Sequence, residues 1–337
     1  MNKPKVAVEA YIQFLVASPA AVSGTEAARV HAGPVVAHEA YTRLLHRLEP
    51  DAAMLWREAQ GLAEPTSGVL VLDDTTLDKP RAKQMGLVTR HWSGKHHAVV
   101  QGINRLTLLW SDGRALVPVD YRLYDKATDH LTKNDHFQHL LQTARQRGFA
   151  PRCVLFDGWY ASLANLKQVR SRGWPWLTRL TRNRLVNPDG QSLRPLADCA
   201  IGPDGQTGWL KGYGSVRVFR LAAPDGGAEG AEYWASSQAQ FSEADRAPLA
   251  ALSWGIEQYH RGRKQCCGVE KAQVRAARAQ RNHIGNHIGC ALRAFLRLET
   301  QRLQTGRSWY EAKKQLLRDA IRTYLANPLY ILHTATA

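Results

Sequence analysis

The sequence has little of what a secreted, membrane-bound or nucleotide-hydrolysing protein needs. Its five cysteines are an odd number and lack the spacing of a disulfide framework, which is typical of a reducing cytoplasm. No apolar run is long enough for a signal peptide or for a helix that crosses a bilayer. No glycine-rich phosphate loop is present. We therefore expect a cytoplasmic protein with no membrane partner and no nucleotide cofactor.

Acidic residues are also scarce. The chain has 45 lysines and arginines against 29 aspartates and glutamates, which gives a net charge of +16. From Gln258 to the C-terminus the imbalance is sharper, with 15 basic and 4 acidic residues. Phosphate groups attract such a surplus of cations, and the release of counterions favours binding. The composition therefore predicts a nucleic acid as the partner.

The first 66 residues are predicted to be helical. A break at Gly33 and Pro34 separates two segments with helical periodicity, and the second segment carries Arg43 and Arg47. A helix, a tight break and a second helix form the pattern of a helix-turn-helix, whose second helix enters the major groove of DNA. Ordinary packing of helices gives the same pattern, so DNA recognition by Arg43 and Arg47 is one of two interpretations.

Strand signals begin at Gly68. The run Val-Leu-Val-Leu at 69–72 contains no polar residue and leads into two aspartates, which is typical of a central strand buried on both faces. Two longer strand candidates follow, and the turn between them at 111–114 contains a glycine, so we expect a hairpin. A helix in the segment 133–149, with apolar residues at helical spacing over 137–144 and Gly148 at its end, and a second buried strand at 153–156 come next.

After the second buried strand, the chain is predicted to form first a β-rich segment and then a helical one. Short alternating segments rich in glycine and proline indicate a β-strand insertion, and the chain after it is helical with a break near Gly306. The expected fold is α/β: a mixed sheet with a β-rich insertion, and helical regions at both ends. We expect a helical, DNA-binding region at 1–66, the first part of the α/β core at 67–182, the insertion at 183–242, a helix that completes the core at 243–280, and a basic helical region for DNA contact or dimerisation at 281–337.

Three acidic residues stand at distinct points of this order. Asp73 ends the first strand, Asp157 ends the fourth, and Glu257 lies on the helix after the insertion. The order of elements resembles the ribonuclease H-like fold, which carries metal-binding acids at these points. Carboxylate oxygens are the ligands that Mg²⁺ prefers, and a site with two ions can activate a hydroxyl and stabilise a leaving oxygen.

The sequences around the three acids carry a closer resemblance. VLVLDDTTLDKP, VLFDGWYAS and IEQYHRGRK resemble the motifs of bacterial insertion-sequence DDE transposases, of the IS-four and Tn-five kinds that have a β-strand insertion. The resemblance covers roughly residues 68–274. It implies a prokaryotic, nucleoid-associated enzyme that cleaves the ends of an insertion element with Mg²⁺ or Mn²⁺, two ions being expected, and joins the 3′ ends to target DNA. It also implies a homodimer on double-stranded DNA.

Two aspartates compete for the first metal-binding position. The family pattern of Asp, any residue, Thr is met by Asp73 with Thr75 and also by Asp74 with Thr76. Asp73 directly follows the apolar run and is the preferred ligand, which leaves Asp74 as a supporting residue or an exposed turn residue. Lys79, in the same motif, is a candidate DNA contact.

The helix that carries Glu257 has a row of basic residues. His260, Arg261 and Lys264 lie three, four and seven residues further on, share one helical face with the glutamate, and are candidate DNA contacts. Surface ion pairing gives the same spacing. The related transposases have the signature Y-x2-R-x3-E-x6-K on this helix, which Glu257 and Lys264 match.

The signature is not complete. Ala250 and Ser253 stand at the tyrosine and arginine positions, so the phosphate contacts of those two residues do not transfer. In the insertion, Trp234 is a candidate for stacking on a flipped base, as the resemblance implies, although an aromatic residue in a small β unit is commonly core. Two rival functions remain: a ribonuclease H-like nuclease that does not join strands, and a catalytically silent DNA-binding protein derived from a transposase.

Overall fold

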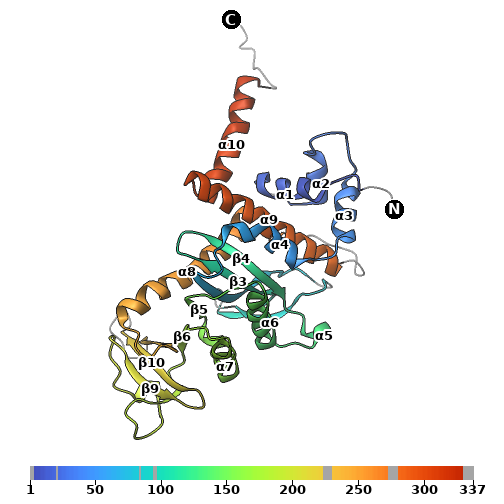
Figure 1. Ribbon diagram of the computed structural model, residues 1–337. Coiled ribbons are helices and arrows are strands. Elements are labelled where there is room, and N and C mark those ends of the chain that lie inside the picture. Colours follow the sequence, from blue (N-terminus) through green and yellow to red (C-terminus); the bar gives the residue numbers. More distant parts are fainter. Residues whose placement is uncertain are drawn as a thin grey trace, which may run out of the picture. The chain divides into compact units, whose positions relative to one another are not determined.

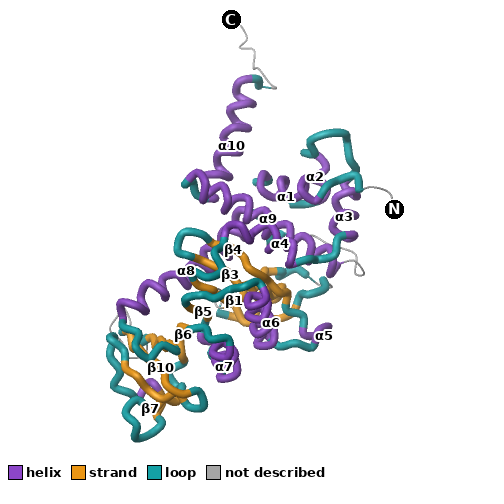
Figure 2. Tube along the Cα trace, viewed as in Figure 1, coloured by secondary structure: helices purple, strands orange, loops and turns teal. Residues whose placement is uncertain are grey.

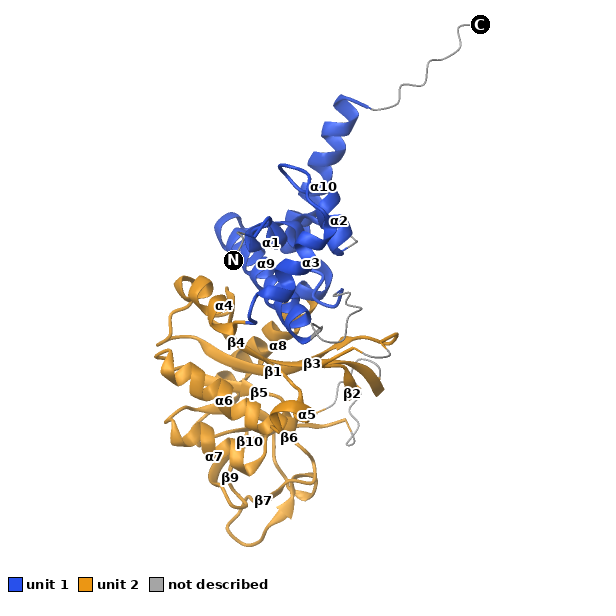
Figure 3. Ribbon diagram, turned by 90° about the vertical axis from the view of Figure 1, so that its right-hand side faces the viewer, with its two compact units in different colours: residues 1–50, 262–337 blue, residues 51–261 orange. Residues whose placement is uncertain are grey.

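A computed structural model describes residues 4–19, 22–82, 85–93, 97–222, 230–271 and 280–328 (Figure 1). It contains helices and strands in a mixed α/β arrangement (Figure 2). The chain divides into two compact units: residues 51–261 form the larger one, and residues 1–50 with 262–337 form the smaller one (Figure 3). Within the described residues, no helix is long and apolar enough to cross a membrane.

The larger unit is built on a mixed sheet. Its core strands are β1 (Val69–Asp78), β2 (Thr89–Ser93), β3 (Ala98–Ser111), β4 (Leu116–Leu123), β5 (Cys153–Phe156) and β6 (Trp176–Leu180). β1 is antiparallel to β3 and parallel to β5, β3 is also antiparallel to β2 and β4, and β5 is parallel to β6. The order β4-β3-β1-β5-β6, antiparallel first and parallel last, is the ribonuclease H-like arrangement expected from the sequence.

The apolar run of β1 lies at the centre of this sheet. Val69, Leu70, Val71 and Leu72 are at most 1% exposed, and β3 and β5 pair with β1 on either side. The expected burial on both faces is therefore confirmed, but the prediction that Asp73 ends the strand is wrong, because β1 continues to Asp78. The β3–β4 hairpin is confirmed as well, and Gly113 in its turn has a φ of +95°, a conformation that residues with a Cβ rarely adopt.

The predicted insertion continues the same sheet. Its strands are β7 (Leu185–Asn187), β8 (Arg194–Pro195), β9 (Gln206–Leu210), β10 (Gly214–Leu221) and β11 (Glu232–Ser236). β11 pairs antiparallel with β6, with Ser236 opposite Leu177, and β10, β9, β7 and β8 follow in that order. The insertion is β-rich, as expected, and its strands are joined to the core by backbone hydrogen bonds.

Helices cover the sheet of the larger unit. They are α4 (Ala52–Ala59), α5 (Lys126–Asp129), α6 (Lys133–Gln146), α7 (Leu163–Ser171) and most of α8 (Glu243–Cys266), with short 3₁₀ turns η1 (Gln60–Leu62), η2 (Gly158–Tyr160) and η3 (Leu196–Asp198). The expected helix α6 buries Phe137, Leu140 and Leu141 and contacts β3 and β4. Thr132 and Asp135 form a capping box at its N-terminus, which stabilises a helix by about 1 kcal/mol.

The smaller unit joins the two ends of the chain. It contains α1 (Val8–Ala17), α2 (Gly24–Arg29), α3 (His38–Arg47), α9 (Gln280–Thr305) and α10 (Trp309–Ala326). α1 and α3 pack on α9: the Tyr11 hydroxyl lies 2.9 Å from His287 Nδ1, and the Asn286 side chain donates to the carbonyl of Leu45. The expected break at Gly306 separates α9 from α10, and this glycine has a φ of +73°.

Candidate active site

Two adjacent aspartates on β1 point to opposite faces of the sheet, because successive side chains of a strand alternate. Asp74 turns toward α6 and η2, where its carboxylate accepts hydrogen bonds from Lys133 Nζ at 2.8 Å and from the Tyr160 hydroxyl at 2.7 Å. Burial alone would raise the pKa of Asp74, but the Lys133 charge and the hydrogen bonds, including one from Asn104, lower it. Asp73 instead faces α8.

The negative charge around Asp73 is not balanced in the same way. Burial raises the pKa of Asp73 well above its usual value, and the carboxylates of Asp74, Glu257 and Asp157 raise it further. About a fifth of the Asp73 side chain, 21%, is exposed to solvent. Glu257 and Asp157, the other two acids expected from the sequence, therefore both act electrostatically on Asp73; these three carboxylates, from β1, β5 and α8, are called the acid cluster.

Asp157 directly follows β5, the parallel neighbour of β1. Its carboxylate lies 3.6 Å from Arg179 Nη2 on β6, and about half of each side chain is exposed, 48% for Asp157 and 50% for Arg179. The next residue has to be small, because a Cβ at Gly158 would lie 2.9 Å from the backbone oxygen of Arg179. The Asp-Gly sequence thus lets the chain leave β5 close to β6 while presenting the carboxylate at the end of the strand.

α8 presents one exposed and one buried polar side chain to this region. Glu257 is exposed, whereas His260 is only 4% exposed. The His260 ring lies with Nε2 3.8 Å from Asp73 Oδ2 and with Nδ1 3.4 Å from Arg105 Nη2. We expected His260 to contact DNA, and a ring buried between Asp73 and Arg105 does not fit that role. Helical spacing from Glu257 correctly indicated proximity to the site but not burial.

The other basic residues of α8 differ in exposure. Arg261 is exposed, and its guanidinium lies 5.9 Å from the ring centre of Trp254, whose side chain is 54% exposed. Trp254 and Glu257 are three residues apart, so both side chains lie on one face of the helix. Lys264 belongs to the smaller unit, where its ammonium lies 2.9 Å from the Glu270 carboxylate.

The acid cluster consists of carboxylates, which are suitable ligands for a divalent cation. Mg²⁺ prefers carboxylate oxygens and retains several waters, so a few protein ligands suffice. In the side-chain positions of this structure, no three His, Cys, Asp or Glu residues among those described lie close enough together to bind one metal ion. Asp157 is turned to Arg179, and Glu257 faces solvent. A cation beside Asp73 would offset both the burial and the repulsion that raise its pKa.

The remaining predicted DNA contacts are two arginines on α3 and the lysine that follows β1. Arg43 and Arg47 are exposed on α3, where Arg43 lies 3.5 Å from Glu39. Lys79 directly follows β1 and is partly exposed. These positions leave the three basic side chains accessible to a phosphate backbone.

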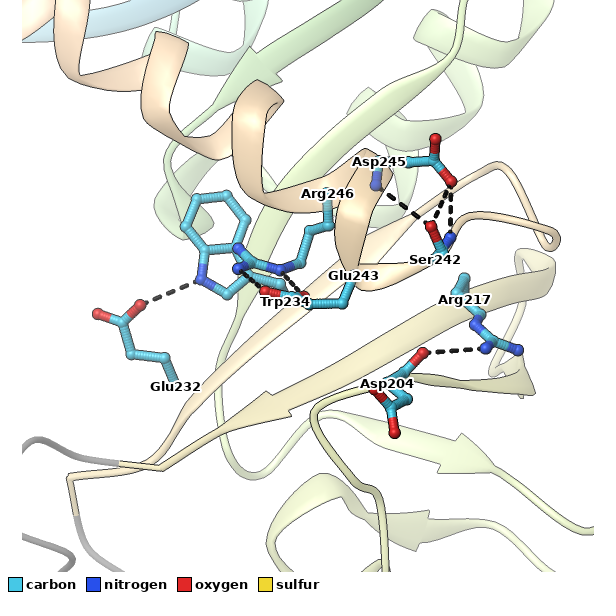
Figure 4. Close-up of polar contacts among 8 residues, drawn as sticks. All are labelled: Asp204, Arg217, Glu232, Trp234, Ser242, Glu243, Asp245 and Arg246. Atoms are coloured by element: carbon cyan, nitrogen blue, oxygen red, sulfur yellow. Dashed lines mark hydrogen bonds and ion pairs between the residues drawn. The ribbon is translucent and has the colours of Figure 1, made fainter.

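Trp234 lies in a polar cluster of the insertion. Figure 4 shows its indole beside Arg246, whose guanidinium is 5.4 Å from the ring centre, and its ring nitrogen donates to Glu232 at 3.1 Å. Arg179 is 5.8 Å from the same ring and pairs with Glu232 at 3.2 Å. Because Arg179 also approaches Asp157, a chain of charged contacts links Trp234 to the acid cluster.

Sequence reasoning missed several side chains of this region. Trp254 could have been found from its helical spacing to Glu257, and Tyr160 from its place three residues after Asp157. Lys133, Arg105 and Arg179 carry no local signal, since their acidic or histidine partners come from distant parts of the chain.

A ribonuclease H-like sheet that gathers acidic side chains from β1, β5 and α8 places the protein in the class of ribonuclease H-like proteins. More specifically, the chain belongs to the DDE superfamily endonuclease family, whose model matches residues 6–199. The match includes Asp73 and Asp157, and Glu257 lies beyond it. Membership confirms the expected DDE relationship and supports a transposase-like nuclease; DDE endonucleases generally use divalent metals.

Other comparisons add less. The chain is similar to a solved structure, the Drosophila P element transposase strand transfer complex, with 9% sequence identity and a TM-score of 0.29. The similar part covers 51% of this chain and 37% of that chain, so it spans little more than a third of the transposase. A comparison with curated proteins gives no match.

Proposed function

We propose that this protein is a transposase that binds the ends of an insertion element, cleaves them by metal-dependent hydrolysis and joins the 3′ ends to target DNA. The observation that carries the proposal is the cluster of Asp73, Asp157 and Glu257: burial raises the pKa of Asp73, and the carboxylates of Asp74, Glu257 and Asp157 raise it further. Neighbouring carboxylates destabilise a folded protein unless a cation offsets them. The family match and the surplus of basic residues support DNA as the substrate.

Asp73, Asp157 and Glu257 would hold two Mg²⁺ or Mn²⁺ ions, with Asp73 rather than Asp74 as the ligand from β1. Bound ions of this kind activate the attacking hydroxyl and stabilise the leaving oxygen. Asp74 has a different role, because its ion pair with Lys133 joins the middle of β1 to the first residue of α6. Arg179 pairs with Asp157 at 3.6 Å. If Asp157 served as a metal ligand, the Arg179 guanidinium would keep its ion pair with Glu232 and could also contact a DNA phosphate.

Double-stranded DNA would bind through exposed cations and aromatic rings. The proposed phosphate contacts are Arg43, Arg47, Lys79, Arg261 and Lys264, and the proposed base-stacking residues are Trp234 and Trp254. Base stacking on an aromatic ring tolerates any sequence, which suits the frayed end of a cleaved strand. Two ends have to be held together for transposition, so we propose a homodimer on the element ends, with the basic helices of the C-terminal region contacting DNA or the partner copy.

One observation favours a narrower function. Ser253, at the position of the arginine in related transposases, donates its hydroxyl to the Ala250 carbonyl at 2.6 Å. This hydroxyl is engaged within α8, and Ala250 offers no polar group where a tyrosine is expected. Loss of two phosphate contacts beside Glu257 favours a nuclease that cuts DNA without joining it, as the second candidate function.

Labelled linear DNA that carries the sequences flanking the gene tests these functions. Incubation with a target plasmid in Mg²⁺, in Mn²⁺ and in EDTA should give cut ends and joined products only with metal. Cut ends without joined products would select the nuclease. Tight binding without cutting under either metal would select the silent DNA-binding protein and overturn the enzymatic proposal.

A further inference from the structure

We propose that Arg105 and His260 form a positioning pair for Asp73: Arg105 fixes the orientation and the tautomer of the His260 ring, and the ring holds the Asp73 carboxylate for metal binding. The inference rests on the proposed function, because it assigns Asp73 as a metal ligand. His260 and Arg105 act here through another residue and touch neither substrate nor metal.

The fold places these three side chains on one face of the sheet. Arg105 lies on β3 opposite Thr75 of β1, and Thr75 is two residues from Asp73. Residues two apart on a strand share a face, and so do residues directly opposite in an antiparallel pair. Arg105 is 0% exposed, although arginine is seldom fully buried. A buried cation is costly unless nearby groups compensate its charge, and the acidic side chains near Arg105 can do so.

Donor chemistry determines which nitrogen of His260 carries the hydrogen. A guanidinium has N–H donors and no acceptor, so the His260 Nδ1 that lies 3.4 Å from Arg105 Nη2 has to be the acceptor. The ring hydrogen is then on Nε2, the nitrogen that lies 3.8 Å from Asp73 Oδ2. This distance is longer than a hydrogen bond. The interaction is therefore electrostatic: the positive end of the N–H dipole faces the carboxylate.

Arg105 and His260 offset the repulsion that acts on the Asp73 carboxylate. Asp73 is surrounded by the charges of Asp74, Glu257 and Asp157, which repel its carboxylate. A metal ligand needs a fixed orientation, and groups behind the ligands commonly supply it. A buried guanidinium acting through an imidazole gives Asp73 positive potential from the Arg105 and His260 side chains. The same arrangement explains why His260 is buried rather than exposed beside Arg261.

A spectroscopic experiment on the unmodified protein tests the tautomer. The protein is labelled with ¹⁵N in its histidines, and two-bond nitrogen–proton spectra are recorded in EDTA, with the His260→Gln spectrum used to assign the ring. The expected result is a His260 ring with its hydrogen on Nε2. A hydrogen on Nδ1 would overturn the proposal, since Arg105 could then not be its neighbour in the inferred role.

A binding experiment tests the positioning. Mn²⁺ affinity is measured by electron paramagnetic resonance without DNA for the wild type, His260→Leu, His260→Gln and Asp73→Asn. Leucine fills the space without polar groups, whereas glutamine keeps one acceptor for Arg105 and one donor for Asp73. We expect His260→Leu to weaken Mn²⁺ binding by roughly 10- to 100-fold and His260→Gln to restore most of it.

The outcomes separate this inference from the proposed function. Wild-type affinity in His260→Leu, together with loss of binding in Asp73→Asn, would overturn the positioning pair and leave the metal site intact. No Mn²⁺ binding by the wild type would overturn the metal site itself. Circular dichroism in EDTA identifies a variant that fails to fold, and in that case the tautomer measured in the wild type decides.

Discussion

Lys133 on α6 places its ammonium 2.8 Å from the Asp74 carboxylate on β1. Both side chains are largely shielded from solvent, so the Asp74→Asn substitution leaves the ammonium without its counter-charge. We predict that it lowers the free energy of unfolding by roughly 2–3 kcal/mol at pH 7. Urea unfolding measures this change, and a variant as stable as the wild type contradicts it.

The same ion pair predicts a pH dependence. The folded-state pKa of Asp74 lies below its ordinary value of 3.8, so the stability it contributes is fully present above that value. This contribution disappears as the pH falls through the folded-state pKa. The stability difference between the wild type and Asp74→Asn should therefore shrink when urea unfolding is repeated below pH 4, and a constant difference would argue against the ion pair as its origin.

Asp73 is predicted to behave in the opposite way. Its pKa is raised in the folded state, so the ionised carboxylate destabilises the fold at neutral pH when no metal is present. Asp73→Asn removes that charge and should raise the melting temperature in EDTA by about 1–2 °C, the shift that accompanies roughly 1 kcal/mol in a protein of this size. It should also abolish the increase that Mg²⁺ gives the wild type. Thermal unfolding with and without Mg²⁺ checks both, and a variant that melts earlier in EDTA contradicts the account.

Arg179 competes with metal for Asp157. The two side chains are half exposed, and such pairs contribute at most about 1 kcal/mol, so Arg179→Gln should strengthen Mn²⁺ binding by no more than about fivefold. Arg194→Gln is a matched control, because Arg194 pairs with Asp189 in the insertion. Isothermal titration with Mn²⁺ compares the variants. Weaker binding in Arg179→Gln would mean that the arginine supports the site instead of occupying it.

Gly158 sets the approach of the Asp157 loop to β6. A Cβ there would meet the Arg179 carbonyl at 2.9 Å, a distance that forces one backbone to move. Gly158→Ala should therefore displace Asp157, weaken Mn²⁺ binding, and lower stability by about 1–3 kcal/mol. Gly202→Ala serves as the control, since a Cβ at Gly202 meets no atom within 4 Å. Equal Mn²⁺ affinity for both variants would show that the loop tolerates the shift.

Much of the core could be predicted from local pattern. The run Val69 to Leu72 and the strand before Asp157 are wholly apolar, and such segments have few alternatives to a central strand. The choice between Asp73 and Asp74 was harder. Since both faces of β1 are covered, burial pattern does not say which face holds the site, and only the partners Lys133 and His260 distinguish them.

The surroundings of the site depend on contacts between distant segments. Arg105 and His260 are 155 residues apart, and a basic residue within a strand reads locally as solvent-facing. We expected one face of α8 to present exposed basic residues, and the burial of His260 does not fit that expectation. The pairing of β11 with β6 is equally non-local, so the sequence indicated an insertion but not its continuity with the core sheet.

Metal-dependent cutting by a single-site variant tests the central claim most directly. Labelled DNA with the flanking sequences is incubated with the wild type, Glu257→Gln, and Glu49→Gln as a control at another exposed acid. The account predicts that the wild type and Glu49→Gln cut in Mg²⁺ or Mn²⁺, while Glu257→Gln binds DNA normally but cuts no more than the wild type does in EDTA. Wild-type cutting by Glu257→Gln would contradict the assignment of the acid cluster as the active site.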